Sequence, residues 1–71
     1  MSKEILSPMT GNMWKMLVKD GDTFAAGDTL AILESMKMEI PIEAEEDGTV
    51  EKVLIAEGDL VDEDVAILTY V

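Results

Sequence analysis

The chain is organised around a stretch that occurs twice, GNMWKMLVKDGD at 11–22 and GTVEKVLIAEGD at 48–59. The copies lie 37 residues apart (Gly11 to Gly48) and share the glycines, a lysine and the final aspartate. Ala-Ile-Leu at 31–33 then matches Ala-Ile-Leu at 66–68 at an offset of 35, which predicts a shorter loop in the second copy. Neither copy can bury an apolar face alone, so we expect two similar half-sheets packed about an approximate two-fold axis.

Turn residues recur at short intervals and separate segments rich in β-branched and aliphatic residues, a pattern typical of short strands. We predict strands at 4–6, 13–18, 30–35, 38–44, 49–55 and 65–71. In the segment 38–44 the residues Met38, Ile40, Ile42 and Ala44 alternate with polar ones, which predicts that this set faces inward. Pro41 cannot donate to a ladder, so its strand should lie at an edge or turn the proline nitrogen outward.

Met36 and Lys37 alone separate two of these predicted strands, which makes them the central residues of a tight hairpin turn. Two-residue turns favour positive φ, which Asn or Gly normally supplies. Met and Lys at these positions cost roughly 1–3 kcal/mol of local strain, and such a breach of turn chemistry is more often functional than accidental. Lys37 is therefore a candidate functional residue, although most lysines in turns are simply solvated.

The stretch ESMKMEI at 34–40 resembles the biotin attachment site of biotinyl domains, the biotin carboxyl carrier family, and the likeness extends over 6–68. Ser35 stands where the family usually has alanine. The resemblance implies that Lys37 carries biotin through an amide. It also suggests that Met36 and Met38 form an adaptable apolar surface read by several partners. Core filling is the alternative for the methionines, especially for Met38.

Glu34 and Glu39 flank this motif, and each is either a solvated strand charge or, with Ser35, part of the surface that a basic biotin protein ligase recognises. Glutamate three residues before the lysine also occurs in lipoyl domains, so Glu34 does not distinguish the two cofactors. The methionines do, because lipoyl domains usually carry an acidic-Lys-Ala core. A lipoyl carrier for acyl transfer remains the alternative function. An enzyme using Lys37 as a Schiff-base nucleophile would need a desolvating pocket, which a hairpin tip does not offer.

The resemblance implies an all-β fold: a flattened barrel or sandwich of two four-stranded antiparallel sheets, formed by a single domain, 1–71. Its lysine lies on a hairpin tip at one end and its termini lie at the other. Reaching eight strands requires two short ones near 22–24 and 59–61. The implied function is a carrier that moves a carboxyl group from a biotin carboxylase to a carboxyltransferase. The segment 14–22 has no inserted thumb loop, as in small free-standing biotin/lipoyl attachment proteins.

The composition of the 71 residues limits the possible functions. The chain has no Cys and no His, so it lacks the usual zinc ligands, thiol nucleophile and imidazole base, and we expect neither a metal site nor catalysis of its own. Sixteen acidic residues against five basic ones give a net charge of −11, which disfavours nucleic acid and anionic membranes and favours partners with basic surfaces. The longest apolar runs are too short to span a membrane.

Three further expectations concern the remaining features. Trp14, the only tryptophan, is expected to pack in the core rather than to stack on a ligand. Carboxylate clusters at 43–47 and 62–64 lack EF-hand spacing and are interpreted as solvated turns. The N-terminus has no apolar segment of signal-peptide length, which predicts a cytoplasmic location unless the chain was cut from a larger protein. We expect the isolated domain to be a monomer.

Overall fold

The computed structural model describes residues 2–71, so Met1 of the predicted domain lies outside the described part. These residues form eight strands and no helix, and hence none that could cross a membrane. The strands are β1 (Lys3–Leu6), β2 (Gly11–Met16), β3 (Thr23–Phe24), β4 (Thr29–Ser35), β5 (Met38–Glu43), β6 (Gly48–Val53), β7 (Leu60–Val61) and β8 (Ala66–Tyr70). All eight predicted strands are therefore present, with ends that differ by one or two residues.

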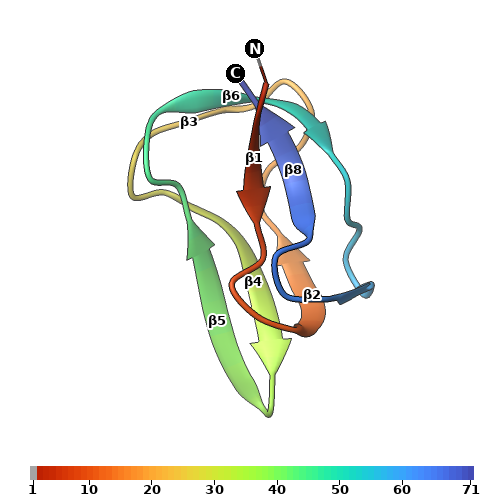
Figure 1. Ribbon diagram of the computed structural model, residues 1–71. Coiled ribbons are helices and arrows are strands. Elements are labelled where there is room, and N and C mark those ends of the chain that lie inside the picture. Colours follow the sequence, from red (N-terminus) through yellow and green to blue (C-terminus); the bar gives the residue numbers. More distant parts are fainter. Residues whose placement is uncertain (1) are drawn as a thin grey trace.

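The strands form two four-stranded sheets, with the orders β1-β8-β6-β3 and β5-β4-β2-β7. We call them sheet 1 and sheet 2. Every pairing is antiparallel, which confirms the predicted fold class (Figure 1). Each sheet takes strands from both copies of the repeat: β3 joins β6 and β8, while β7 joins β2 and β4. The halves are thus interleaved, so neither copy forms a sheet of its own.

A pseudo-two-fold relation connects the two sheets residue by residue. Strand β2 pairs Met13 with Leu33, and β6 pairs Val50 with Tyr70, a shift of 37 for both partners (50 − 13 and 70 − 33). Both strands carry a β-bulge directly after this pair. The same shift relates the two outer pairs, because Ala31 pairs with Ile42 as Leu68 pairs with Ile5. We call residues related by this shift mates.

The predicted offset of 35 for the Ala-Ile-Leu segments is therefore wrong, and no loop is shortened in the second copy. Ala31 is the mate of Leu68 (68 − 31 = 37) rather than of Ala66. A shift of two residues along a strand leaves every side chain on the same side of the sheet. The apolar pattern is thus satisfied by either alignment, and only the backbone ladder decides between them.

Hydrogen bonds in the turns obey the same relation. The Met13 N–H donates to the Asp59 carbonyl at 2.9 Å, and the Val50 N–H donates to the Asp22 carbonyl at 2.7 Å. Acidic side chains accept backbone N–H donors in the turns of both halves: Glu57 from Met16, Asp20 from Val53, Asp59 from Ala56 and Asp22 from Lys19. Part of the strongly acidic composition therefore serves to build turns.

The core lies between the two sheets. Its largest fully buried apolar side chains come from both halves: Met13, Leu30, Leu33, Val50, Val61, Ile67 and Leu68. In β5 the predicted alternation is correct for Ile42 and Ala44, which are buried, and for Ile40, which packs partly against the core. Strand β5 is an edge strand, as Pro41 predicted.

Trp14 is not a core residue, so that prediction is wrong. Its side chain is 43% exposed, and the Lys15 Nζ lies 5.5 Å from the centroid of its ring. The physical reason is the β-bulge of β2: the ladder pairs Met13 with Leu33 and then Lys15 with Ile32, which leaves Trp14 as the extra residue. A bulge re-aims the side chain, and here the indole lies at the surface although its strand is apolar.

Candidate attachment site at a hairpin tip

The β4–β5 hairpin ends in the turn that the sequence predicted. The ladder continues to the pair Ser35 and Met38, so Met36 and Lys37 are the two central residues. Their φ angles are +51° and +65°. Positive φ at both central positions is the signature of a type I′ turn, whose twist matches that of the flanking strands. The strain expected for Met and Lys at these positions is therefore present in the fold.

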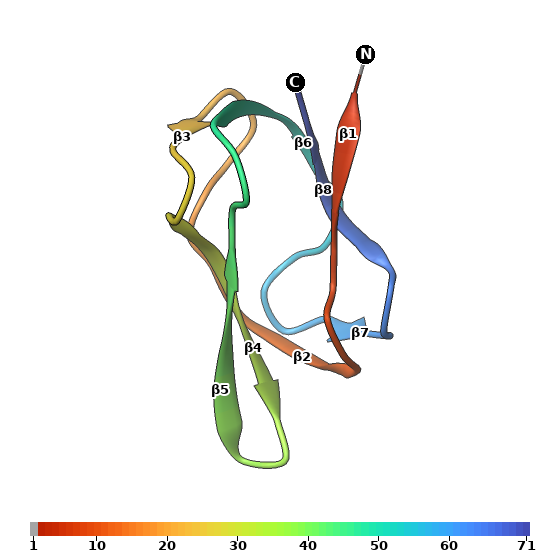
Figure 2. The ribbon, with the colours of Figure 1, turned by 60° about the vertical axis from the view of Figure 1, so that its left-hand side comes forward.

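This hairpin projects beyond the rest of the molecule, and the two termini lie together at the opposite end (Figures 1 and 2). Met36 is 92% exposed and Met38 is 64% exposed, so neither fills the core. Met38 has the inward phase of Ile40 and Ile42, but the hairpin has run past sheet 1 at this point and nothing covers it. The interpretation of Met36 and Met38 as core residues is wrong, and both offer apolar surface beside Lys37.

We expect Met36→Asn to stabilise the fold by up to about 1 kcal/mol, because asparagine tolerates positive φ at the first central position of a type I′ turn. Chemical denaturation measures this change directly. Met38→Asn is the control: it places a poor strand former in β5, outside the turn, and should leave stability unchanged or lower it. A Met36→Asn protein less stable than the wild type would show that the turn is not strained.

The acidic residues of the motif face each other across the hairpin. Glu34 and Glu39 are directly opposite in the ladder and both are exposed. Like charges at such positions are destabilising by a few tenths to about 1 kcal/mol. Their mates are Val71 and Ser2, which lie just outside the ends of β8 and β1 and carry no like-charged side chains (34 + 37 = 71; 39 − 37 = 2). The repulsion is thus a feature of the Lys37 hairpin alone, and the fold does not require it.

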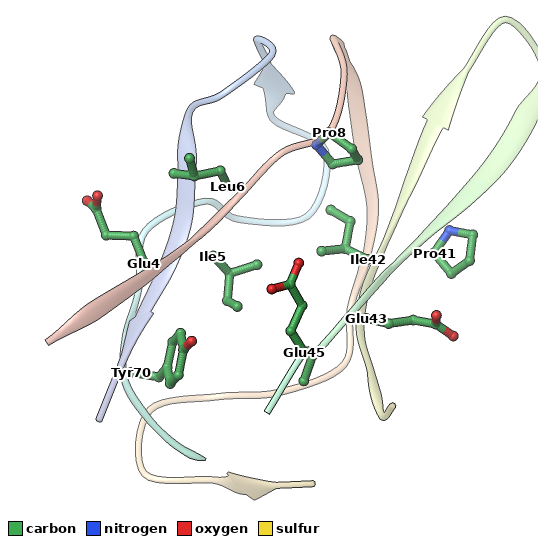
Figure 3. A pocket seen from close by; sticks show the side chains of 10 residues that line it. Glu4, Ile5, Leu6, Pro8, Pro41, Ile42, Glu43, Glu45 and Tyr70 are labelled. Carbon is green, nitrogen blue, oxygen red and sulfur yellow. The ribbon is translucent and has the colours of Figure 1, made fainter. Parts of the chain in front are cut away.

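A groove of about 580 Å³ lies elsewhere, between the edge strands β1 and β5. Figure 3 shows the mates Ile5 and Ile42 lining it, one from each strand, with Tyr70 and Glu45 nearby. Lys37 does not line this groove. Its amine is on an exposed turn, which fits a group that is modified by another protein and does not fit the desolvated amine of a Schiff-base enzyme.

Within residues 2–71, no group of three or more His, Cys, Asp or Glu side chains is placed to hold a metal ion. Two carboxylates of 43–47 take structural roles. Glu46 accepts hydrogen bonds from the Lys3 ammonium at 2.6 Å and the Tyr70 hydroxyl at 2.8 Å, and Asp47 accepts one from the Ala26 N–H at 2.8 Å. The Lys3 ammonium holds the pKa of the Glu46 carboxyl below its ordinary value.

Comparisons with known proteins agree with this arrangement. The family described as "Biotin-requiring enzyme", the biotin/lipoyl attachment family, matches residues 3–69. The chain belongs to this family. A Bacillus subtilis (strain 168) protein named "Biotin/lipoyl attachment protein" is 56% identical over 55 residues, which are 78% of this chain and 75% of that protein.

Larger proteins contain relatives of this biotinyl domain. The mouse "Methylcrotonoyl-CoA carboxylase subunit alpha, mitochondrial" is 47% identical over 53 residues, 75% of this chain and 7% of that protein. The structure of the Kluyveromyces lactis urea carboxylase superposes with a TM-score of 0.90 and 34% identity, over 100% of this chain and 6% of that one. The biotinyl domain thus corresponds to a small part of these enzymes.

The structure also exposes apolar side chains that the motif does not include. Leu60, in β7 of the same sheet as the hairpin, is 80% exposed. Sequence reasoning did not single out this residue and assigned Trp14 to the core. Aligning the two repeats would have indicated that Leu60 and Trp14 are exposed, because their mates Thr23 and Glu51 are polar (60 − 37 = 23; 14 + 37 = 51).

Proposed function

We propose that this biotinyl domain is a biotin carboxyl carrier whose cofactor is linked by an amide to the Lys37 Nζ. The observation that carries the proposal is the turn itself: a lysine between two exposed methionines, held at positive φ on a projecting hairpin, in a member of the biotin-requiring family. Glycine or asparagine would suit this turn better, so the residues present at the tip are there for what they offer a partner.

Attachment requires the neutral lysine amine, whereas a lysine in water is almost entirely protonated at neutral pH. The attaching enzyme must therefore accept the proton while the Nζ forms a bond to an activated biotin acyl carbon and the activating group leaves. The chain contributes access and orientation to this step. Met36 and Met38 provide apolar contact area around the amine, and Glu34 and Glu39 provide charge for a basic enzyme surface.

Bound biotin would supply the group that accepts and releases a carboxyl unit, at a biotin carboxylase and a carboxyltransferase respectively. The domain's own contribution is the tether. A cofactor on a flexible arm at a projecting tip is present near each partner site at roughly millimolar effective concentration. The names of the relatives, methylcrotonoyl-CoA carboxylase and urea carboxylase, support a role in this class of enzyme. We propose that the domain does no bond chemistry itself and acts as a monomer in the cytoplasm.

A lipoyl carrier is the second candidate, because the Bacillus subtilis relative is named for both cofactors. The two exposed methionines favour biotin over lipoate at Lys37.

The carrier role is tested by two successive reactions. The apo domain is first incubated with a biotin protein ligase, ATP and biotin. The purified product is then incubated with a separate biotin carboxylase component, ATP and ¹⁴C-bicarbonate. We expect label to co-migrate with the domain only when both steps are complete, and to be lost on addition of a carboxyltransferase with its acceptor. A biotinylated domain that takes no label from any of several carboxylase components would contradict the carrier role.

A further inference from the structure

The pseudo-two-fold relation allows the outer faces of the two sheets to be compared position by position. Sheet 2, which ends in the Lys37 hairpin, has an apolar set of outward-facing residues that we call the apolar face: Trp14, Ile32, Pro41 and Leu60. Their mates on sheet 1 are Glu51, Thr69, Glu4 and Thr23, all polar. Both sets occupy equivalent backbone positions, so folding alone makes the same demand on each. The difference between them calls for another cause.

Side-chain contacts show that two of the sheet 1 positions, Glu51 and Thr69, are neighbours. On sheet 1 the Glu51 carboxylate accepts hydrogen bonds from the Thr69 hydroxyl at 3.2 Å and from the Ser2 hydroxyl at 2.5 Å. The polar face of sheet 1 is therefore satisfied by its own groups. On sheet 2 the corresponding residues are Trp14 and Ile32. The ladder pairs Ile32 with Lys15, the residue after the bulge, and the Trp14 side chain is 43% exposed, with the Lys15 Nζ 5.5 Å from its ring centroid. Trp14 therefore leaves apolar surface exposed at a position where its mate Glu51 presents a carboxylate.

The apolar face is continuous with the Lys37 hairpin. Ile32 and Pro41 are partners in the β4–β5 ladder, directly below the pair Glu34 and Glu39. Asn12 pairs with Glu34, which is three residues from Lys37, and Trp14 lies two residues beyond Asn12. Trp14 is thus five residues from Lys37 along the sheet (2 + 3), roughly 17 Å at strand spacing. Leu60 pairs with Asn12 on the other side. One protein surface can therefore cover the tip, the two glutamates and the apolar face together.

We propose that the apolar face is a docking surface for the biotin-attaching enzyme, and that this enzyme meets it with an apolar patch bordered by basic residues. The inference rests on the proposed function of Lys37. The attaching enzyme acts on the lysine amine before the long biotinyl arm exists, so its active site must approach within one lysine side chain of the hairpin. At that distance its surface also reaches the sheet from which the hairpin projects. A carboxylase reached by the completed arm has no such constraint.

Charge complementarity identifies the border of the contact. Glu34 and Glu39 lie between the tip and the pair Ile32 and Pro41, in the same row across the sheet as Leu60, and the chain carries a net charge of −11. The two glutamates border this face on the side of the hairpin, whereas Lys15 lies over the Trp14 ring. Exposed aromatic and aliphatic side chains with charged groups at their rim are typical of interfaces whose centre is desolvated and whose rim selects the partner. Binding energy from this remote face would hold the lysine in place during attachment.

The first test compares biotinylation kinetics of the apo domain and of a Trp14→Thr, Leu60→Thr double variant, using a biotin protein ligase with saturating ATP and biotin. Threonine suits exposed strand positions and is the residue that the chain itself places at the mate of Leu60. We expect the KM for the variant to rise at least tenfold, with kcat changed less than twofold because the hairpin is untouched. Leu54→Thr is the matched control: it removes an exposed leucine beside β8 in sheet 1, and its kcat/KM should stay within twofold.

A second measurement keeps the wild-type sequence and only labels the tryptophan ring with fluorine. Its only tryptophan is replaced by 5-fluorotryptophan, and the single ¹⁹F resonance of Trp14 is followed during titration with ligase loaded with a non-reactive biotinyl-adenylate analogue. The methyl resonances of Met36 and Met38 report saturation of the tip. We expect the Trp14 resonance to shift or broaden in parallel with them.

Wild-type kinetics for a folded double variant, or an unchanged ¹⁹F resonance with the tip saturated, would overturn the inference while leaving the proposed function intact. A wild-type domain that no biotin ligase modifies would instead refute the proposed function. Sedimentation velocity tests whether a second copy of the chain, rather than the attaching enzyme, occupies the apolar face. A wild-type dimer that the double variant dissociates would assign the apolar face to a second copy of the chain, and this too would overturn the inference.

Discussion

A Lys37→Arg protein is expected to fold like the wild type and to gain no cofactor when incubated with biotin protein ligase, ATP and biotin. Arginine keeps the charge and the exposed position, so stability should change by no more than about 0.5 kcal/mol. Its guanidinium is a poor nucleophile that stays protonated. Intact mass spectrometry should show complete conversion of the wild type and none of the variant.

The other lysines are expected to stay unmodified for structural reasons. Lys3 is paired with Glu46 at 2.6 Å, Lys15 lies over the Trp14 ring, and Lys52 is on β6 of sheet 1. Lys19 follows β2 at the opposite end from the hairpin, and its N–H donates to the Asp22 carboxylate. None is on a projecting turn between methionines. Biotin on a well-folded Lys37→Arg protein would contradict the assignment, and a thermal melt of the same sample establishes that it is folded.

The choice of cofactor is expected to change when the methionines are replaced. A Met36→Asp, Met38→Ala variant, which imitates the acidic-Lys-Ala core of lipoyl domains, should lose biotinylation and tend to gain lipoylation. Two apolar side chains buried against the ligase contribute roughly 1–2 kcal/mol each, while an aspartate would be desolvated without a partner. The expected loss in kcat/KM is roughly tenfold to several-hundredfold.

The structure makes this experiment interpretable. Met36 is 92% exposed and Met38 is 64% exposed in the free domain, so their replacement removes little from the core and the fold should survive. Leu54→Thr again serves as the control for loss of an exposed apolar side chain away from the hairpin. Wild-type rates of biotinylation in the folded double variant would mean that the position of the turn alone selects the cofactor.

Most of the fold follows from patterns with a clear physical cause. The turn residues and the strand-like segments located six of the eight strands, and the family resemblance supplied the short strands β3 and β7. Pro41 placed β5 at an edge, and the two-residue gap located the hairpin turn. The offset between the Ala-Ile-Leu segments of the two halves could not be predicted, because a shift of two residues leaves the same side chains facing inward and outward. The interleaving of the halves also depends on which strands pair over long distances, which the pattern within each strand does not encode.

The motif identified the candidate site residues but did not predict how exposed they are. Met38 has the phase of a core residue and becomes a surface residue because the hairpin extends past the opposite sheet. Trp14 lies in an apolar strand and becomes exposed because a β-bulge re-aims it. The exposure of Met38 depends on where one sheet ends relative to the other, and the exposure of Trp14 depends on one extra residue in a ladder. Local sequence carries no signal for either, whereas comparison of Trp14 with its mate Glu51 does.

The most direct test of the account is to map the modified residue in the wild-type protein. The folded apo domain is incubated with biotin protein ligase, ATP and biotin, and the product is digested and sequenced by tandem mass spectrometry. We predict a single biotin per chain, on the peptide that contains Lys37, with Lys3, Lys15, Lys19 and Lys52 unmodified. Biotin on any of those four lysines, or a folded domain that takes no biotin, would contradict the central claim that the strained Met36-Lys37 turn is the attachment site.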